Sequence, residues 1–167
     1  MPWNGLKSPG EPAGREDANV GHNYVTYQAV YAGLQLLYSD RQMPNDLLPG
    51  GIKAIQSFYD DLSRKYGYAV GVPESAYSSL ANYIYNQVST DAAVGVAQLY
   101  VKACPESSYA HYLLGRFHHL SGSLREAKED YETAIRQEKA TPKPDPERLV
   151  TYTINLEKVE EQIKERR

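Results

Sequence analysis

Apolar residues recur at steps of three and four along most of this chain, a spacing that places them on one face of an α-helix. The stretch after Pro49-Gly50-Gly51 is a clear example, because its apolar residues keep helical steps until Gly67 ends the pattern. Breaks rich in Gly, Pro or Ser separate seven such stretches, so we predict an all-α fold with about seven helices. The expected helices cover residues 24–38, 52–66, 76–88, 91–103, 107–120, 124–138 and 145–167.

Part of this pattern repeats. Leu80-Ala81 returns as Leu114-Gly115, and Ala93 returns as Ala127, in each case 34 residues later. A period of 34 residues, with small residues where two helices must approach closely, is typical of tetratricopeptide helix pairs. We therefore expect antiparallel helix pairs, 76–88 with 91–103 and 107–120 with 124–138, stacked as a short tetratricopeptide-like solenoid.

The helix ends carry their own signals. Asp145 followed by Pro146 is a strong helix start, because the acid can cap the helix and proline fits its first turn. Ser123 and Glu126 have the spacing of a capping box. The last helix carries an unbroken seam at steps of three and four, which predicts either a helix that caps the solenoid or a self-association helix. The seam residues are Leu149, Tyr152, Leu156, Val159 and Ile163.

Three segments follow from these patterns. Residues 1–21 are dense in Pro and Gly and are expected to be irregular. Residues 22–71 are expected to form a two-helix segment. Residues 72–167 are expected to hold the helical repeats and the capping helix.

Composition and charge narrow the function classes. The chain has 167 residues and a net charge of −3, with a pI near 5.8, which argues against nucleic acid or an anionic membrane as the main partner. No run approaches the roughly 20 apolar residues of a membrane span. The single cysteine excludes an internal disulfide, and the compartment stays open between cytoplasm and periplasm. The 15 tyrosines are interpreted as packing residues of the helix pairs.

Candidate chemistry is sparse. His111 and His118 lie seven residues apart on one expected helix, too far apart to hold a metal without a third ligand. No metal-binding, nucleotide-binding or Gly-x-Ser-x-Gly motif occurs. We therefore expect no enzyme activity, no metal and no cofactor for this chain alone.

The surface expected to bind a partner is the groove along the first helix of each pair. Such a groove could hold a peptide or another protein domain. A clamp for a peptide carboxylate would need several basic or amide residues, and this face offers Asn82, Arg116 and few others. The groove residues are expected to be Tyr77, Ala81, Tyr85, His111, Gly115 and His118.

One stretch carries a family resemblance. In residues 21–38, His22 precedes a helix with Tyr31, Gly33, Leu34, Leu37 and Tyr38. This order resembles the end of the catalytic domain in esterase-D-like α/β-hydrolases, the group that includes enterochelin-type esterases, and the resemblance continues to about residue 138. It implies that the chain is the C-terminal helical part of such a hydrolase. It also implies that His22 is the triad histidine, while the nucleophile serine and the acid lie outside the chain.

Three functions remain open at this point. The first is a non-catalytic interaction or scaffold module, forming the C-terminal part of an esterase-like hydrolase. The second is a working part of a serine esterase, to which His22 is contributed. The third is a scaffold that forms a homodimer or larger homo-oligomer through the helix at 145–167.

Overall fold

The structure of this protein is a computed structural model that describes residues 29–30 and 42–166. The chain divides after Gln42 into two compact units, and the unit that begins at Met43 holds nearly all of the described residues. Ala29 and Val30 are helical, but the remainder of the helix expected over 24–38, and His22, lie outside the described residues.

All of the described secondary structure is helical. A 3₁₀ helix, η2 (Asn45–Gly50), leads directly into α2 (Gly51–Tyr66), and five further α-helices follow: α3 (Glu74–Gln87), α4 (Thr90–Ala103), α5 (Ser108–Leu120), α6 (Leu124–Ala140) and α7 (Pro146–Glu165). The all-α prediction is confirmed for the described residues. The count there is six α-helices instead of about seven, since the expected helix at 24–38 is not among them.

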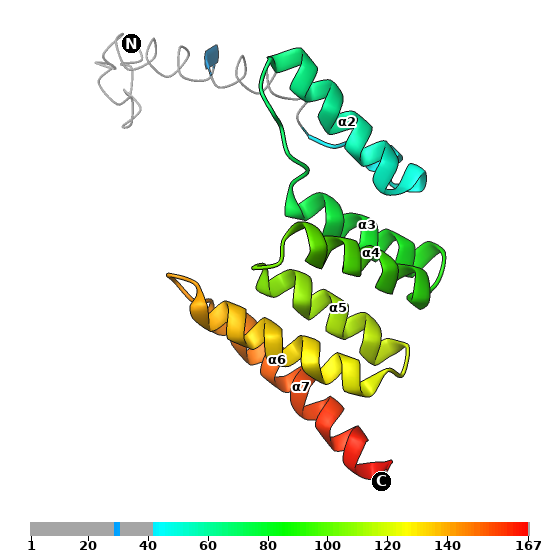
Figure 1. The fold of residues 1–167 in the computed structure, drawn as a ribbon, viewed down its shortest axis with the longest axis vertical. Coiled ribbons are helices and arrows are strands. Elements are labelled where there is room, and N and C mark those ends of the chain that lie inside the picture. The colour runs from blue at the N-terminus through cyan, green and yellow to red at the C-terminus, as the bar shows by residue number, and fades with distance from the viewer. Residues whose placement is uncertain (1–28, 31–41, 167) are drawn as a thin grey trace, which may run out of the picture. The chain divides into compact units, whose positions relative to one another are not determined.

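The helices of the Met43 unit stack in chain order. Figure 1 shows consecutive helices running back and forth beside one another from α3 to α7. Each helix packs mainly on the one before and the one after it, and α7 also reaches α5. This sequential packing is that of a helical solenoid, in which each element relies on its neighbours to cover its apolar face.

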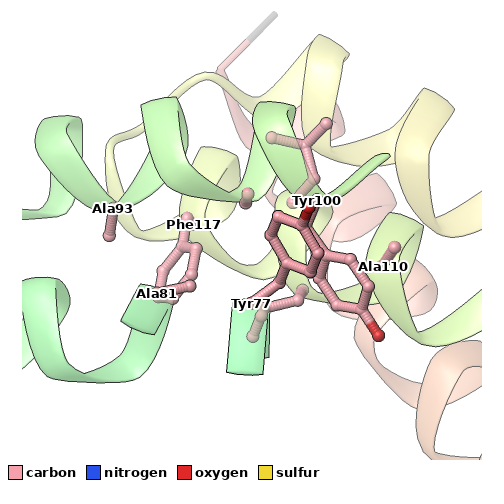
Figure 2. Close-up of a cluster of buried hydrophobic side chains, with 9 residues drawn as sticks. Tyr77, Ala81, Ala93, Tyr100, Ala110 and Phe117 are labelled. Atoms are coloured by element: carbon pink, nitrogen blue, oxygen red, sulfur yellow. The ribbon is translucent and has the colours of Figure 1, made fainter. Parts of the chain in front are cut away.

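Tyrosine rings and small residues share the core between α3, α4 and α5. The rings of Tyr77 and Tyr100 stack with centroids 5.5 Å apart, and Phe117 lies beside Ala81 and Ala93 (Figure 2). Alanines at these crossings let the helix backbones approach, so the large rings can fill the remaining space.

Burial recurs with the 34-residue period. A residue buried in α3 or α4 has a buried counterpart at the same place in α5 or α6. The pairs are Ala76 and Ala110, Leu80 and Leu114, Ala81 and Gly115, Ala93 and Ala127, Ala97 and Tyr131, and Tyr100 and Ala134.

The closest helix contact is that of α5 with α6 at Gly115. A Cβ atom added to Gly115 would lie 3.0 Å from the Cβ of Asp130 and 3.0 Å from a ring carbon of Tyr131. Real side chains rarely come this close, so glycine at this position lets α5 and α6 touch.

The predicted helix caps are right at one end and wrong at another. Asp145 accepts hydrogen bonds from the backbone amides of Glu147 and Arg148, as expected for the start of α7. The capping box of Ser123 and Glu126 does not form, because the Ser123 side chain accepts no amide of α6. Gly122 adopts a positive φ of 83°, and its carbonyl accepts the Leu124 amide at 3.0 Å, so the backbone closes this turn itself.

The seam of α7 is covered by the helices before it. Tyr152 and Val159 are 1% and 0% exposed, and Leu156 and Ile163 pack on the cluster that contains Tyr131. The apolar stripe of α7 therefore closes the end of the stack, and residues of its other face, such as Val150, meet solvent.

A buried carboxylate joins the last three helices. Glu138 of α6 is 2% exposed and accepts a hydrogen bond from the hydroxyl of Ser108, at the start of α5. Its other oxygen accepts the backbone amide of Asp145, the cap of α7, at 2.8 Å. A buried charge is tolerated only with such partners, so Glu138 fixes the position of α7 on the pair before it.

Among the described helices, none combines the length and the apolar character needed to cross a lipid bilayer.

Candidate functional site

Three of the six residues expected to line a groove lie in the interior. Tyr77 and Ala81 are 8% and 0% exposed, and Gly115 is buried against Asp130 and Tyr131 of α6. The physical reason is that the small residues mark where helices cross, and a crossing point faces another helix. These three residues offer almost no surface to a ligand.

Two histidines of the expected groove are engaged within the fold. His118 Nδ1 lies 2.7 Å from Asp130 Oδ2 of α6, and the two side chains are only 16% and 17% exposed. Burial raises the pKa of Asp130 above its ordinary value, and His118 opposes this rise. His111 Nε2 lies 3.0 Å from the carbonyl oxygen of Pro105, in the turn before α5. Both rings therefore tie α5 to its surroundings.

The sixth residue, Tyr85, lies beside a different side chain, Arg116. The guanidinium carbon of Arg116 lies 5.5 Å from the ring centroids of Tyr85 and Phe117. Its Nη1 donates a hydrogen bond of 3.2 Å to the side-chain oxygen of Asn82 on α3. The Asn82 amide nitrogen in turn donates to the Ser78 carbonyl at 2.9 Å. This chain of contacts holds the guanidinium between α3 and α5.

The same side of α5 also meets α7. The ring of Tyr112, one helical turn before Arg116, stacks on Tyr152 with centroids 4.6 Å apart. His119 Nε2 lies 3.2 Å from the side-chain oxygen of Gln162. Burial raises the pKa of Tyr112, and the Arg116 charge opposes this rise, which agrees with their closeness. We call this side the inner face, defined by the partly buried residues Asn82, Tyr85, Tyr112, Arg116, His119 and Gln162.

Sequence reasoning placed the ligand surface on the right helices but mostly on the wrong residues. The signal that could have found the inner face is the period itself, because Asn82 and Arg116 are 34 residues apart. Residues one period apart occupy the same place on successive first helices. Two polar residues at such a place can touch, as the 3.2 Å hydrogen bond between Asn82 and Arg116 shows.

The described residues do not assemble a reactive centre. They contain no group of three or more His, Cys, Asp or Glu side chains that could hold a metal ion. Burial and the nearby Glu74 raise the pKa of the Cys104 thiol, which works against thiolate formation. Glu74 itself accepts hydrogen bonds from Tyr100 Oη and Ser107 Oγ, both at 2.6 Å, and thereby links α3, α4 and α5.

A charged hollow of about 560 Å³ lies between α6 and α7. Lys128 bridges Glu160 at 2.6 Å and Glu132 at 3.6 Å, and the hydrogen bond to Glu160 raises the pKa of Lys128. The acids and bases of this hollow neutralise one another, so it has no excess of either charge. Its lining is Arg125, Lys128, Glu129, Glu132, Glu160, Ile163 and Lys164.

Comparison of the chain with protein-family models, with curated proteins and with solved structures gave no match.

Proposed function

We propose that this chain is a non-catalytic, tetratricopeptide-like interaction module that binds an extended peptide or protein segment along its inner face. The repeat type is supported by the 34-residue period, in which six pairs of buried positions in α3 and α4 recur in α5 and α6. Stacked helix pairs of this kind present the side chains of successive first helices along one continuous surface.

The observation that carries the proposal is the arrangement of Arg116 on that surface. Its guanidinium is held by the side chain of Asn82 and by the ring of Tyr85, both from the neighbouring first helix. Side chains that are already ordered lose little conformational entropy when a ligand contacts them. Aromatic and arginine residues are also the types that contribute most to protein interfaces.

An array of immobilised random nonapeptides, acetylated and amidated at their ends, tests this function. The intact chain is expected to enrich a definable set of peptides. The double substitution Asn82→Ala and Tyr85→Ala should reduce that binding by about tenfold or more, because two ordered contacts are removed. The matched control is Gln98→Ala with Lys102→Ala, both exposed on α4. If no peptide is enriched, or if the control loses binding equally, the function is wrong.

We also propose that this module is the C-terminal part of an esterase-like hydrolase. The support is the resemblance of residues 21–38, with His22 as the histidine of a triad whose other members lie outside the chain. A full-length parent should hydrolyse a short-chain p-nitrophenyl ester and lose this activity with His22→Ala. The chain alone should not hydrolyse it, and turnover by the chain that His22→Ala abolishes would overturn its non-catalytic role.

A further inference from the structure

Arg116 has an unusual environment for a partly buried arginine. Among the described residues, every carboxylate within ion-pair distance of a base pairs with a base other than Arg116. Its surroundings are an amide oxygen of Asn82 and the rings of Tyr85 and Phe117. A partly desolvated charge without a counter-ion favours an anion that arrives from outside.

The neighbouring hydroxyls add to this preference. Tyr131 of α6 has a fully buried hydroxyl without a hydrogen-bond partner. Its ring centroid lies 5.8 Å from that of Tyr112, which precedes Arg116 by one helical turn. The Arg116 charge opposes the rise in pKa that burial causes at both tyrosines. Thus the surroundings of the guanidinium are polar but uncharged, and the described contacts supply no acid that would compete with a ligand.

We propose that Arg116 binds the carboxylate of an aspartate or glutamate side chain within the bound peptide. The inference rests on the proposed function and names the chemical class of its ligand. The planar guanidinium presents several donors in a fork that fits a carboxylate, and only one of these donates to Asn82.

The position of Arg116 favours a side-chain carboxylate over the carboxylate at a chain end. Arg116 lies inside α5, with contacts from α3 on one side and the contacts of α5 with α7 on the other. A peptide can therefore continue in both directions past the guanidinium. The surfaces that it would meet carry Tyr85 on one side and His119 and Gln162 on the other.

The same amidated nonapeptide array provides the test, because its peptides have no terminal carboxylate. The enriched peptides should share an aspartate or glutamate at one position. Arg116→Gln removes the charge but keeps a polar side chain, and it should weaken binding of these peptides by about tenfold or more. Lys102→Gln removes the same charge from exposed α4 and is the matched control, which should bind as the unchanged protein does. Circular dichroism establishes that both variants are folded.

The outcomes separate this inference from the function beneath it. Enrichment of peptides without a shared acid, or full binding by Arg116→Gln, overturns the acidic ligand and leaves the peptide-binding function standing. Equal weakening by Lys102→Gln also overturns it, since net charge would then account for the effect. A second array with free C-termini completes the test: binding that occurs only there identifies a terminal carboxylate and contradicts the side-chain assignment. Failure of both arrays to enrich any peptide removes the function itself.

Discussion

Replacing Gly115 with alanine should reveal how tightly α5 and α6 are packed. The new methyl carbon would lie 3.0 Å from Asp130 Cβ and 3.0 and 3.1 Å from two ring carbons of Tyr131. Asp130 Cβ is attached directly to the α6 backbone, and the Tyr131 ring is 0% exposed. Neither neighbour can turn away into solvent, so the two helices must separate.

Gly95 provides a matched control for the magnitude. It lies in α4, it is exposed, and a Cβ atom there would meet no atom within 4 Å. Gly95→Ala should stabilise the fold by about 0.5–1 kcal/mol, because alanine favours the helix. Gly115→Ala gains the same propensity but bears an overpacking cost of about 1–3 kcal/mol. The difference between the two variants therefore isolates the cost of the contact, and the bulkier Gly115→Leu should cost more than Gly115→Ala.

Thermal unfolding followed by circular dichroism is the assay. For a helical unit of this size, 1 kcal/mol corresponds to about 4 °C in Tm, so Gly115→Ala should melt about 4–12 °C below Gly95→Ala. Adding Tyr131→Leu to Gly115→Ala should recover part of the loss, because the shorter side chain makes room for the methyl group. A Tm for Gly115→Ala equal to or above that of Gly95→Ala would refute the close packing of α5 on α6.

Three further predictions concern the core, the last helix and alkaline pH. Glu138→Ala should lower the free energy of unfolding in urea by about 1–3 kcal/mol, because Ser108 and the Asp145 amide lose their partner, whereas exposed Glu132→Ala should change it by less than about 0.5 kcal/mol; equal effects would contradict the role of Glu138. The intact chain should sediment as a monomer, because the α7 seam is covered, while a chain that ends at Thr141 should self-associate or melt lower, and an unchanged truncated chain would show that α7 is no cap. Burial raises the pKa of six tyrosines above 10, so the unfolded chain loses these protons first; stability should be complete below about pH 10 and fall as the pH rises further, and tyrosinate absorbance that titrates fully before unfolding would argue against this.

The helices and their order could be predicted from the sequence because local patterns specify them. Apolar steps of three and four, the Asp145-Pro146 start and the glycines at 67 and 122 act over a few residues, and the structure has α2 to α7 where these patterns lie. The 34-residue period likewise identified which alanines and glycines would be buried at helix crossings. Local patterns did not foresee η2, where Pro49 lies within a 3₁₀ helix.

The surface for a ligand was decided by tertiary structure. Burial of Tyr77, Ala81 and Gly115 depends on which neighbouring helix covers each residue, and helical spacing within one segment does not contain this information. The same holds for His118, whose partner Asp130 is 12 residues away, and for Arg116, which Asn82 holds from 34 residues away. The sequence by itself determined an all-helical chain with one repeated unit. Only the packing of α3, α5 and α7 side by side decided that Arg116 stands on their common face without a carboxylate partner.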